Sequence, residues 1–246
     1  LGDLYIDEKI GIVPSTKWKL ENLELPWYLG ETIITGIGQG YIQSTPLQLC
    51  LMTAQLANGG YKIKPQIILD DELNYEDIRS MIKLDLEKYN LSSNPKKLIE
   101  LNKGILQEQN IELYKPMYRN PENVKFVLEA MFASTNELYG TSFNSRHEDE
   151  KYQFAGKTGT SQVRRITEAE READLKISEI EYKNRDHALY VAFAPYKDPR
   201  YAISVLIEHG GSGSKVAAPI ANKFIKKIID RHKFREFQRI KVNDLA

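Results

Sequence analysis

The segment FAGKTGTSQV, residues 154–163, decides the fold of this sequence. We expect a strand from Tyr152 to Val163 that carries Lys157 and two threonines. Gly-Lys-Thr also occurs in phosphate-binding loops. Those loops need a glycine five residues before Gly156, where Lys151 stands, and a helix directly after the motif. We therefore reject that interpretation. By itself the triplet fits either an ordinary surface strand or a strand whose lysine and hydroxyl groups hold a carboxylate.

Two short apolar runs follow in the last third of the chain. Residues 188–194 and 201–207 are nearly continuous in apolar side chains, and the turn at 197–200 between them predicts a hairpin. Continuous apolar runs indicate strands that are covered on both faces. The spacing of apolar residues over 212–231 predicts a helix after the hairpin. The sum predicts an α+β fold, in which helices cover an antiparallel sheet.

The first half of the chain contains signals for two more helices. Residues 1–35 are turn-rich and lead to a glycine-rich loop at 36–40, whose spacing does not fit a dinucleotide-binding fingerprint. Ser44-Thr45-Pro46 then provides an N-cap residue and a proline for the first turn of a helix, which ends at Asn58-Gly59-Gly60. Apolar spacing predicts another helix over 121–134.

Composition excludes several classes of function. The chain has 246 residues, 34 basic and 34 acidic side chains and a formal net charge of zero. This balance argues against nucleic acid or an acidic membrane surface as the main partner. The one cysteine, Cys50, allows neither an internal disulfide nor a thiolate metal cluster. The four histidines lack metal-ligand spacing, and we expect no metal and no cofactor.

Two segments differ from the rest of the chain. Residues 70–110 alternate acidic and basic side chains, and we interpret them as an inserted, solvated subdomain. Residues 164–186 form a charged connection after the lysine strand, which we interpret as a flap. The chain starts without methionine, and we expect it to be internal to a longer protein.

The order of these motifs resembles the transpeptidase domain of class B penicillin-binding proteins. The matching segments are residues 36–40, 44–49, 58–60, 140–141, 154–163 and 186–195. The pair Trp18-Lys19 and the segment Pro26-Trp27-Tyr28 most resemble the elongation-type members. Each motif alone is short, but their order is specific, and the resemblance covers nearly the whole chain apart from 70–110 and 164–186. The resemblance implies the penicillin-binding transpeptidase or serine β-lactamase-like fold, here incomplete at its N-terminus.

The resemblance also implies an activity and a site. This family crosslinks peptidoglycan stem peptides through an acyl-serine intermediate, and β-lactams acylate the same serine. Lys157 would supply positive charge beside the substrate carboxylate, which Thr158 and Thr160 would hydrogen-bond. Gly159 would let the ligand backbone approach closely, and the backbone N–H of Thr160 would contribute to the oxyanion hole.

Two elements of the family are missing before residue 36, namely Ser-x-x-Lys with the nucleophile and Ser-x-Asn. Ser-x-x-Lys occurs later, at Ser80, Ser93 and Ser212, and Ser-x-Asn occurs at Ser92, Ser134 and Ser142. We interpret these as chance matches. Ser80 follows the glycine-rich loop instead of preceding it, and its charged neighbours predict a solvated helix. We therefore expect residues 1–246 to be the C-terminal portion of one transpeptidase domain, inactive alone.

Two alternatives stay open. One is a D,D-carboxypeptidase or β-lactamase-like hydrolase, in which water replaces the acceptor amine. The other is a non-catalytic penicillin-sensing or scaffold module of the same fold. The resemblance implies stem peptides, β-lactams and membrane proteins of the elongation machinery as partners. It also implies a location on the periplasmic side of the bacterial inner membrane.

Overall fold

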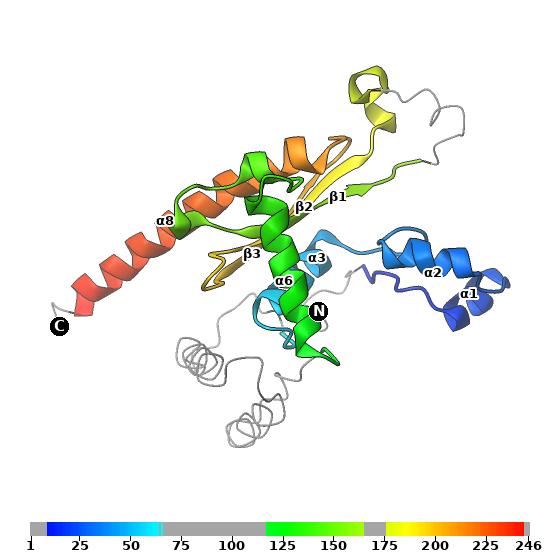
Figure 1. Ribbon diagram of the computed structural model, residues 1–246, viewed down its shortest axis with the longest axis horizontal. Helices are drawn as coiled ribbons and strands as arrows, with labels where there is room; N and C mark the ends of the chain where they lie inside the picture. Colours follow the sequence, from blue (N-terminus) through cyan, green and yellow to red (C-terminus); the bar gives the residue numbers. More distant parts are fainter. Residues whose placement is uncertain (1–8, 64, 66–116, 165–175, 244–246) are drawn as a thin grey trace, which may run out of the picture. The chain divides into compact units, whose positions relative to one another are not determined.

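The computed structural model describes residues 9–63, 65, 117–164 and 176–243 (Figure 1). The predicted insertion at 70–110 lies outside these residues, as does much of the predicted flap at 164–186. The chain divides into two compact units, residues 1–49 and 50–246. In the part of the chain that the structure describes, no helix combines the length and apolarity needed to span a bilayer.

The first unit contains helices α1 (Thr16–Leu23) and α2 (Leu29–Gly36) and the first turn of α3 (Pro46–Ala57). The turn-rich interpretation of residues 1–35 therefore missed two helices. The N-cap of α1 is Ser15, whose Oγ accepts the backbone N–H of Trp18 at 3.1 Å. At α3, Thr45 Oγ1 accepts the backbone N–H of Gln48, and Gln48 Oε1 accepts that of Thr45. These reciprocal bonds confirm the predicted N-cap of α3.

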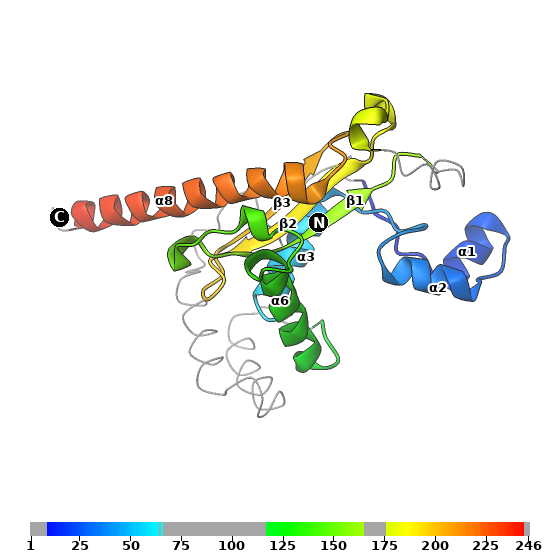
Figure 2. The ribbon, with the colours of Figure 1, turned by 45° about the horizontal axis from the view of Figure 1, so that its top comes forward.

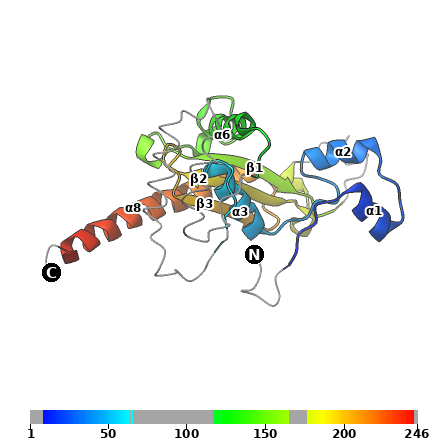
Figure 3. The same cartoon turned by 90° about the horizontal axis from the view of Figure 1, so that it is seen from below.

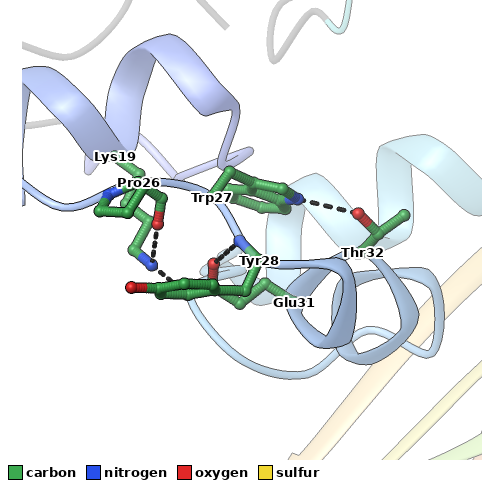
Figure 4. Close-up of polar contacts among 6 residues, drawn as sticks. All are labelled: Lys19, Pro26, Trp27, Tyr28, Glu31 and Thr32. Atoms are coloured by element: carbon green, nitrogen blue, oxygen red, sulfur yellow. Dashed lines mark hydrogen bonds and ion pairs between the residues drawn. The ribbon is translucent and has the colours of Figure 1, made fainter.

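A buried lysine connects α1 to α2. The side chain of Lys19 is only 2% exposed, and its Nζ donates to the carbonyl of Pro26 at 2.7 Å and to Glu31 Oε1 at 2.5 Å (Figure 4). The ammonium also lies 4.7 Å from the centre of the Tyr28 ring. The hydrogen bond from Lys19, followed by the backbone bond from Tyr28, lowers the pKa of the Glu31 carboxyl. A buried cation therefore links the two helices.

We expect Lys19→Met to open this first unit. The variant leaves Glu31 without its cation and the Pro26 carbonyl without its donor. Limited proteolysis should then cleave residues 16–36 more than about tenfold faster than in the wild type. Lys17→Met is the matched control, because Lys17 is 82% exposed and pairs with Glu21 at the surface. Equal cleavage rates for the two variants would contradict the prediction.

The second unit is built on a three-stranded antiparallel sheet in the order β1-β2-β3. The strands are β1 (Ala155–Ser161), β2 (His187–Ala194) and β3 (Tyr201–Ile207). Lys157 pairs with Val191, and Tyr190 pairs with both Thr158 and Val205. The predicted hairpin and antiparallel sheet are confirmed. The residues of β2 are largely buried, whereas those of β3 are partly buried on both faces apart from the buried Val205.

Helices lie on both faces of this sheet (Figures 2 and 3). On one face, small residues of β2 pack against the start of α8 (Ala218–Asn243) and against the π-helical turn η5 (Gly213–Ala217). On the other face, Ala155 and Phe193 pack against α6 (Pro121–Asn136) and the end of α3. Cys50 of α3 donates its thiol to the carbonyl of Ala202 at 3.4 Å. The sheet is therefore the middle layer of three.

The predicted helix boundaries are largely confirmed. The helix predicted over 121–134 ends two residues later, at Asn136. The one predicted over 212–231 starts with η5 and runs on to Asn243, with Ser212 as its N-cap. Short 3-10 turns occupy Phe143–Ser145, Glu150–Tyr152, Ile177–Glu179 and Tyr182–Asn184. Tyr152 belongs to one of these turns instead of to β1, because its backbone N–H donates to the carbonyl of Asp149 at 3.0 Å.

Candidate functional site

The four residues predicted for the site are consecutive on β1, which lies at one edge of the described sheet. Side chains alternate along a strand, so Thr158 and Thr160 share the face of Tyr190 while Lys157 and Gly159 share the opposite face. Thr160 and Lys157 are exposed, and Thr158 and Gly159 are partly exposed. The strand therefore offers both a cation and hydroxyl groups at its edge.

The ammonium of Lys157 reaches across to its neighbour in spite of this alternation. Its Nζ donates to the carbonyl of Thr158 at 2.8 Å and lies 3.5 Å from Thr158 Oγ1. The structure thus brings the charge of Lys157 and the hydroxyl of Thr158 together. An ammonium and a hydroxyl side by side can bind a carboxylate through charge-assisted hydrogen bonds.

The two glycines of β1 differ in what surrounds them. A Cβ on Gly156 would lie 2.3 Å from the hydroxyl oxygen of Tyr190, so packing inside the protein excludes a side chain there. A Cβ on Gly159 would meet nothing closer than Leu189 Cβ at 3.4 Å, which is ordinary contact. The lack of a side chain at Gly159 is therefore not required by the protein's own packing, and it leaves the strand backbone accessible to a ligand.

Beneath this edge, Tyr190 anchors β2 to the segment that follows α6. Its ring is fully buried, and its hydroxyl lies 3.0 Å from Thr135 Oγ1 and 3.1 Å from Ser142 Oγ. Burial raises the pKa of Tyr190, against the opposing effect of the hydrogen bonds from Ser142 and Thr135. The phenol therefore stays neutral and has one hydrogen to donate, which can go to Ser142 Oγ because the Ser142 hydroxyl itself donates to the carbonyl of Ser134.

In the two Ser-x-Asn matches that the structure describes, polar side chains form hydrogen bonds within the fold. Asn136, of the match that begins at Ser134, donates to the carbonyls of Phe132 and Phe154 at 3.0 and 2.9 Å. Ser142, which begins the other described match, is buried against Tyr190. These contacts favour their interpretation as chance matches. Ser92, by contrast, lies outside the described residues.

The one described Ser-x-x-Lys match begins at Ser212. Its Oγ accepts the backbone N–H of Lys215 at 3.4 Å, as the N-cap of η5. Ser80 and Ser93 lie outside the described residues.

Sequence reasoning missed the positions of Ser134 and Thr141. Ser134 Oγ lies 3.3 Å from Thr141 Oγ1, which in turn lies 3.5 Å from Thr158 Oγ1. The sequence contained one hint of this position. The pair Gly140-Thr141 is one of the segments that match the family, although the sequence alone assigned it no role. Only the fold shows that this pair lies beside β1.

His209 has the contacts of a strand-end residue. Its backbone N–H donates to His187 Nδ1 at 3.0 Å, and its own Nδ1 lies 3.0 Å from the carbonyl of Arg185. Among the described residues, no three histidine, cysteine, aspartate or glutamate side chains gather as a metal site would need. The chemistry that the described site offers is that of a cation, hydroxyls and an open strand edge.

Comparison with known proteins identifies the family. The family model described as penicillin binding protein transpeptidase domain matches residues 5–226. The peptidoglycan D,D-transpeptidase MrdA of Salmonella typhimurium is 32% identical over 224 residues, which cover 91% of this chain and 31% of that protein. The corresponding protein of Escherichia coli K12 is 29% identical, with 91% and 30% covered. The chain thus spans about a third of the length of these relatives.

Solved structures agree with this match. Penicillin-binding protein 2 of Helicobacter pylori, in its complex with MreC, is similar with a TM-score of 0.65 and 27% identity, over 92% of this chain and 32% of that one. Penicillin-binding protein 2 of Pseudomonas aeruginosa, in complex with WCK 5153, gives a TM-score of 0.60 and 31% identity, over 91% and 39%. The helix-covered antiparallel sheet is therefore the penicillin-binding transpeptidase fold. The chain belongs to the penicillin-binding protein transpeptidase domain family and is of the penicillin-binding protein 2 type.

Proposed function

We propose that this chain is the C-terminal portion of the transpeptidase domain of a peptidoglycan D,D-transpeptidase. The edge of β1 carries the proposal. There the ammonium of Lys157, the hydroxyls of Thr158 and Thr160 and the accessible backbone at Gly159 lie within the segment that the family model matches. Residues 70–110 would be an inserted subdomain of this domain, and residues 164–186 a charged flap that connects β1 to β2.

The proposed reaction has two acyl-transfer steps. A serine attacks the carbonyl between the two D-alanines of a stem peptide, and the terminal D-alanine leaves, so that an acyl-enzyme forms. The amine of a second stem peptide then attacks the ester and restores the serine. Lys157, Thr158 and Thr160 hold the terminal carboxylate in the first step. The backbone N–H of Thr160 stabilises the oxyanion. A β-lactam acylates the same serine.

The serine itself is proposed to come from residues that are not in this chain. A serine nucleophile needs an adjacent base, and in this family the base is the lysine of Ser-x-x-Lys. In the described part of the chain, the one Ser-x-x-Lys match begins at Ser212, and this serine is the N-cap of η5. This chain should therefore bind a penicillin weakly and form no acyl-enzyme.

Intact-mass spectrometry after incubation with benzylpenicillin tests this proposal. We expect no adduct on the 246-residue chain and one adduct on a protein extended toward the N-terminus. An adduct on the present chain that maps to Ser80 would show that the interpretation of this serine as a chance match is wrong. If neither protein forms an adduct, the non-catalytic module gains support and the proposed function fails.

Product analysis separates transpeptidation from hydrolysis. A transpeptidase joins a donor stem peptide to an added acceptor amine, whereas a carboxypeptidase releases D-alanine at the same rate with or without that amine.

The proposed location is the periplasmic side of the bacterial inner membrane. The proposed partner is an elongation protein of the MreC kind, because the similar Helicobacter pylori protein is in complex with MreC.

A further inference from the structure

A row of three hydroxyl groups leads from α6 to the edge of β1. Ser134 Oγ lies 3.3 Å from Thr141 Oγ1, and Thr141 Oγ1 lies 3.5 Å from Thr158 Oγ1. The ammonium of Lys157 approaches the same Thr158 oxygen at 3.5 Å. Ser134 and Thr141 belong to neither the lysine strand nor the motifs of the nucleophile. They nevertheless lie beside the hydroxyl that is proposed to bind the substrate carboxylate.

A buried layer holds this row in place. Ser142 donates both its backbone N–H and its hydroxyl to the carbonyl of Ser134, at 3.0 and 2.9 Å. Its Oγ also lies 3.1 Å from the hydroxyl of Tyr190, which in turn contacts Thr135. A side chain at Gly140 would approach the carbonyl of Ser134 to 2.4 Å, so the turn there is folded directly onto the end of α6. Thr141 is therefore carried by a segment that is fixed to both α6 and β2.

The donor and acceptor properties of these groups give the row a direction. The ammonium of Lys157 only donates, so the Thr158 oxygen accepts from it. A carboxylate only accepts, so the single hydrogen of Thr158 points to the ligand when a carboxylate binds. The hydroxyl of Thr141 then donates to Thr158, and that of Ser134 donates to Thr141. Hydrogen bonds aligned in this way polarise one another, which strengthens the last donor in the row.

We propose that Thr141, supported by Ser134, is a positioning residue that orients and polarises the hydroxyl of Thr158 toward the ligand carboxylate. The inference rests on the proposed function and adds to it a contact outside the lysine motif. Spacings of 3.3–3.5 Å are long for hydroxyl pairs, and hydrogen bonds at such sites tighten in the complex with a ligand. The row acts on binding of the carboxylate and not on attack by the serine.

The test uses the complete protein, which supplies the nucleophile, and compares Thr141→Val, Thr141→Ser and the wild type. Stopped-flow acylation by benzylpenicillin gives the dissociation constant of the first complex separately from the acylation rate constant. Thr141→Val should weaken binding by about three- to tenfold, the range expected for one hydrogen bond. The acylation rate constant should stay unchanged. Thr141→Ser retains the hydroxyl and should bind like the wild type, and Ser134→Ala should weaken binding less than Thr141→Val.

Two controls separate positioning from structure. The methyl ester of benzylpenicillin lacks the carboxylate, and its acylation should not distinguish Thr141→Val from the wild type. Thr135→Val removes a buried partner of Tyr190, so it should lower the melting temperature and impair both ligands alike. If Thr141→Val behaves like Thr135→Val, or like the wild type with both ligands, the positioning role is overturned. A complete wild-type protein that no penicillin acylates would instead overturn the proposed function, and the inference with it.

Discussion

Lys157→Met should reduce acylation of the complete protein by benzylpenicillin about 10- to 100-fold. The variant removes the charge that approaches Thr158 Oγ1 and carbonyl at the edge of β1. A hydrogen bond to a charged group contributes about 1.5–3 kcal/mol, and about 1.4 kcal/mol corresponds to a factor of ten. The second-order rate constant of acylation, followed by adduct formation, measures the effect.

Lys125→Met is the matched control for this variant. Lys125 is an exposed lysine of α6, and its loss changes the net charge by the same amount without touching β1. Both variants should fold like the wild type, because both side chains are exposed. If Lys157→Met acylates within about threefold of Lys125→Met, the lysine has no role in ligand binding and the assignment of the site fails.

Gly156→Ala should destabilise the second unit by about 3 kcal/mol. The added methyl would lie 2.3 Å from the hydroxyl oxygen of Tyr190 and 2.5 Å from its Cζ, so the ring or the strand has to move. Movement of the ring would break its hydrogen bonds to Thr135 and Ser142, both of which are buried. Denaturant unfolding of the chain, followed by far-ultraviolet circular dichroism, measures the loss, because both tryptophans lie in the first unit and would not report on the second.

Gly159→Ala, three positions along the same strand, should have the opposite profile. The added methyl meets nothing closer than 3.4 Å, so the unfolding transition should stay where it is. Acylation of the complete protein should nevertheless fall by up to about 10²-fold, because the methyl displaces a ligand that lies against the strand. A Gly159→Ala protein that is fully active would place the ligand elsewhere. An equal loss of stability in both variants would refute the different roles of the two glycines.

Local sequence signals predicted the elements of the second unit well. The hairpin of β2 and β3, the strand of Lys157 and the helices α6 and α8 all follow from apolar spacing and turn residues. The end of α8 could not be found in this way, because the residues beyond Arg231 are mostly charged or polar and periodicity says little about them. The first unit was harder, since α1 is anchored by the buried Lys19, and patterns of apolar residues do not reveal a buried cation.

The candidate site was predictable only in part. The motif identified Lys157 and Thr158 as neighbours on a strand, which any extended chain would bring together. It could not show that the Lys157 ammonium meets the Thr158 hydroxyl, or that Thr141 lies on the other side of that hydroxyl. Those contacts depend on Tyr190, which passes over Gly156 to reach the end of α6. Contacts between residues far apart in sequence are set by packing. The pattern of neighbouring residues in a single sequence does not reveal such contacts.

The two connections between the strands of the sheet differ greatly in length. Residues 195–200 join β2 to β3, whereas residues 162–186 join β1 to β2. Closing the longer connection costs on the order of 1 kcal/mol more in chain entropy. We therefore expect the hairpin of β2 and β3, covered by α8, to form first in the folding transition state and β1 to join it late. The strand with the proposed binding groups would then also be the first to detach in partial unfolding, and hydrogen exchange at Thr158 and Thr160 would report that opening.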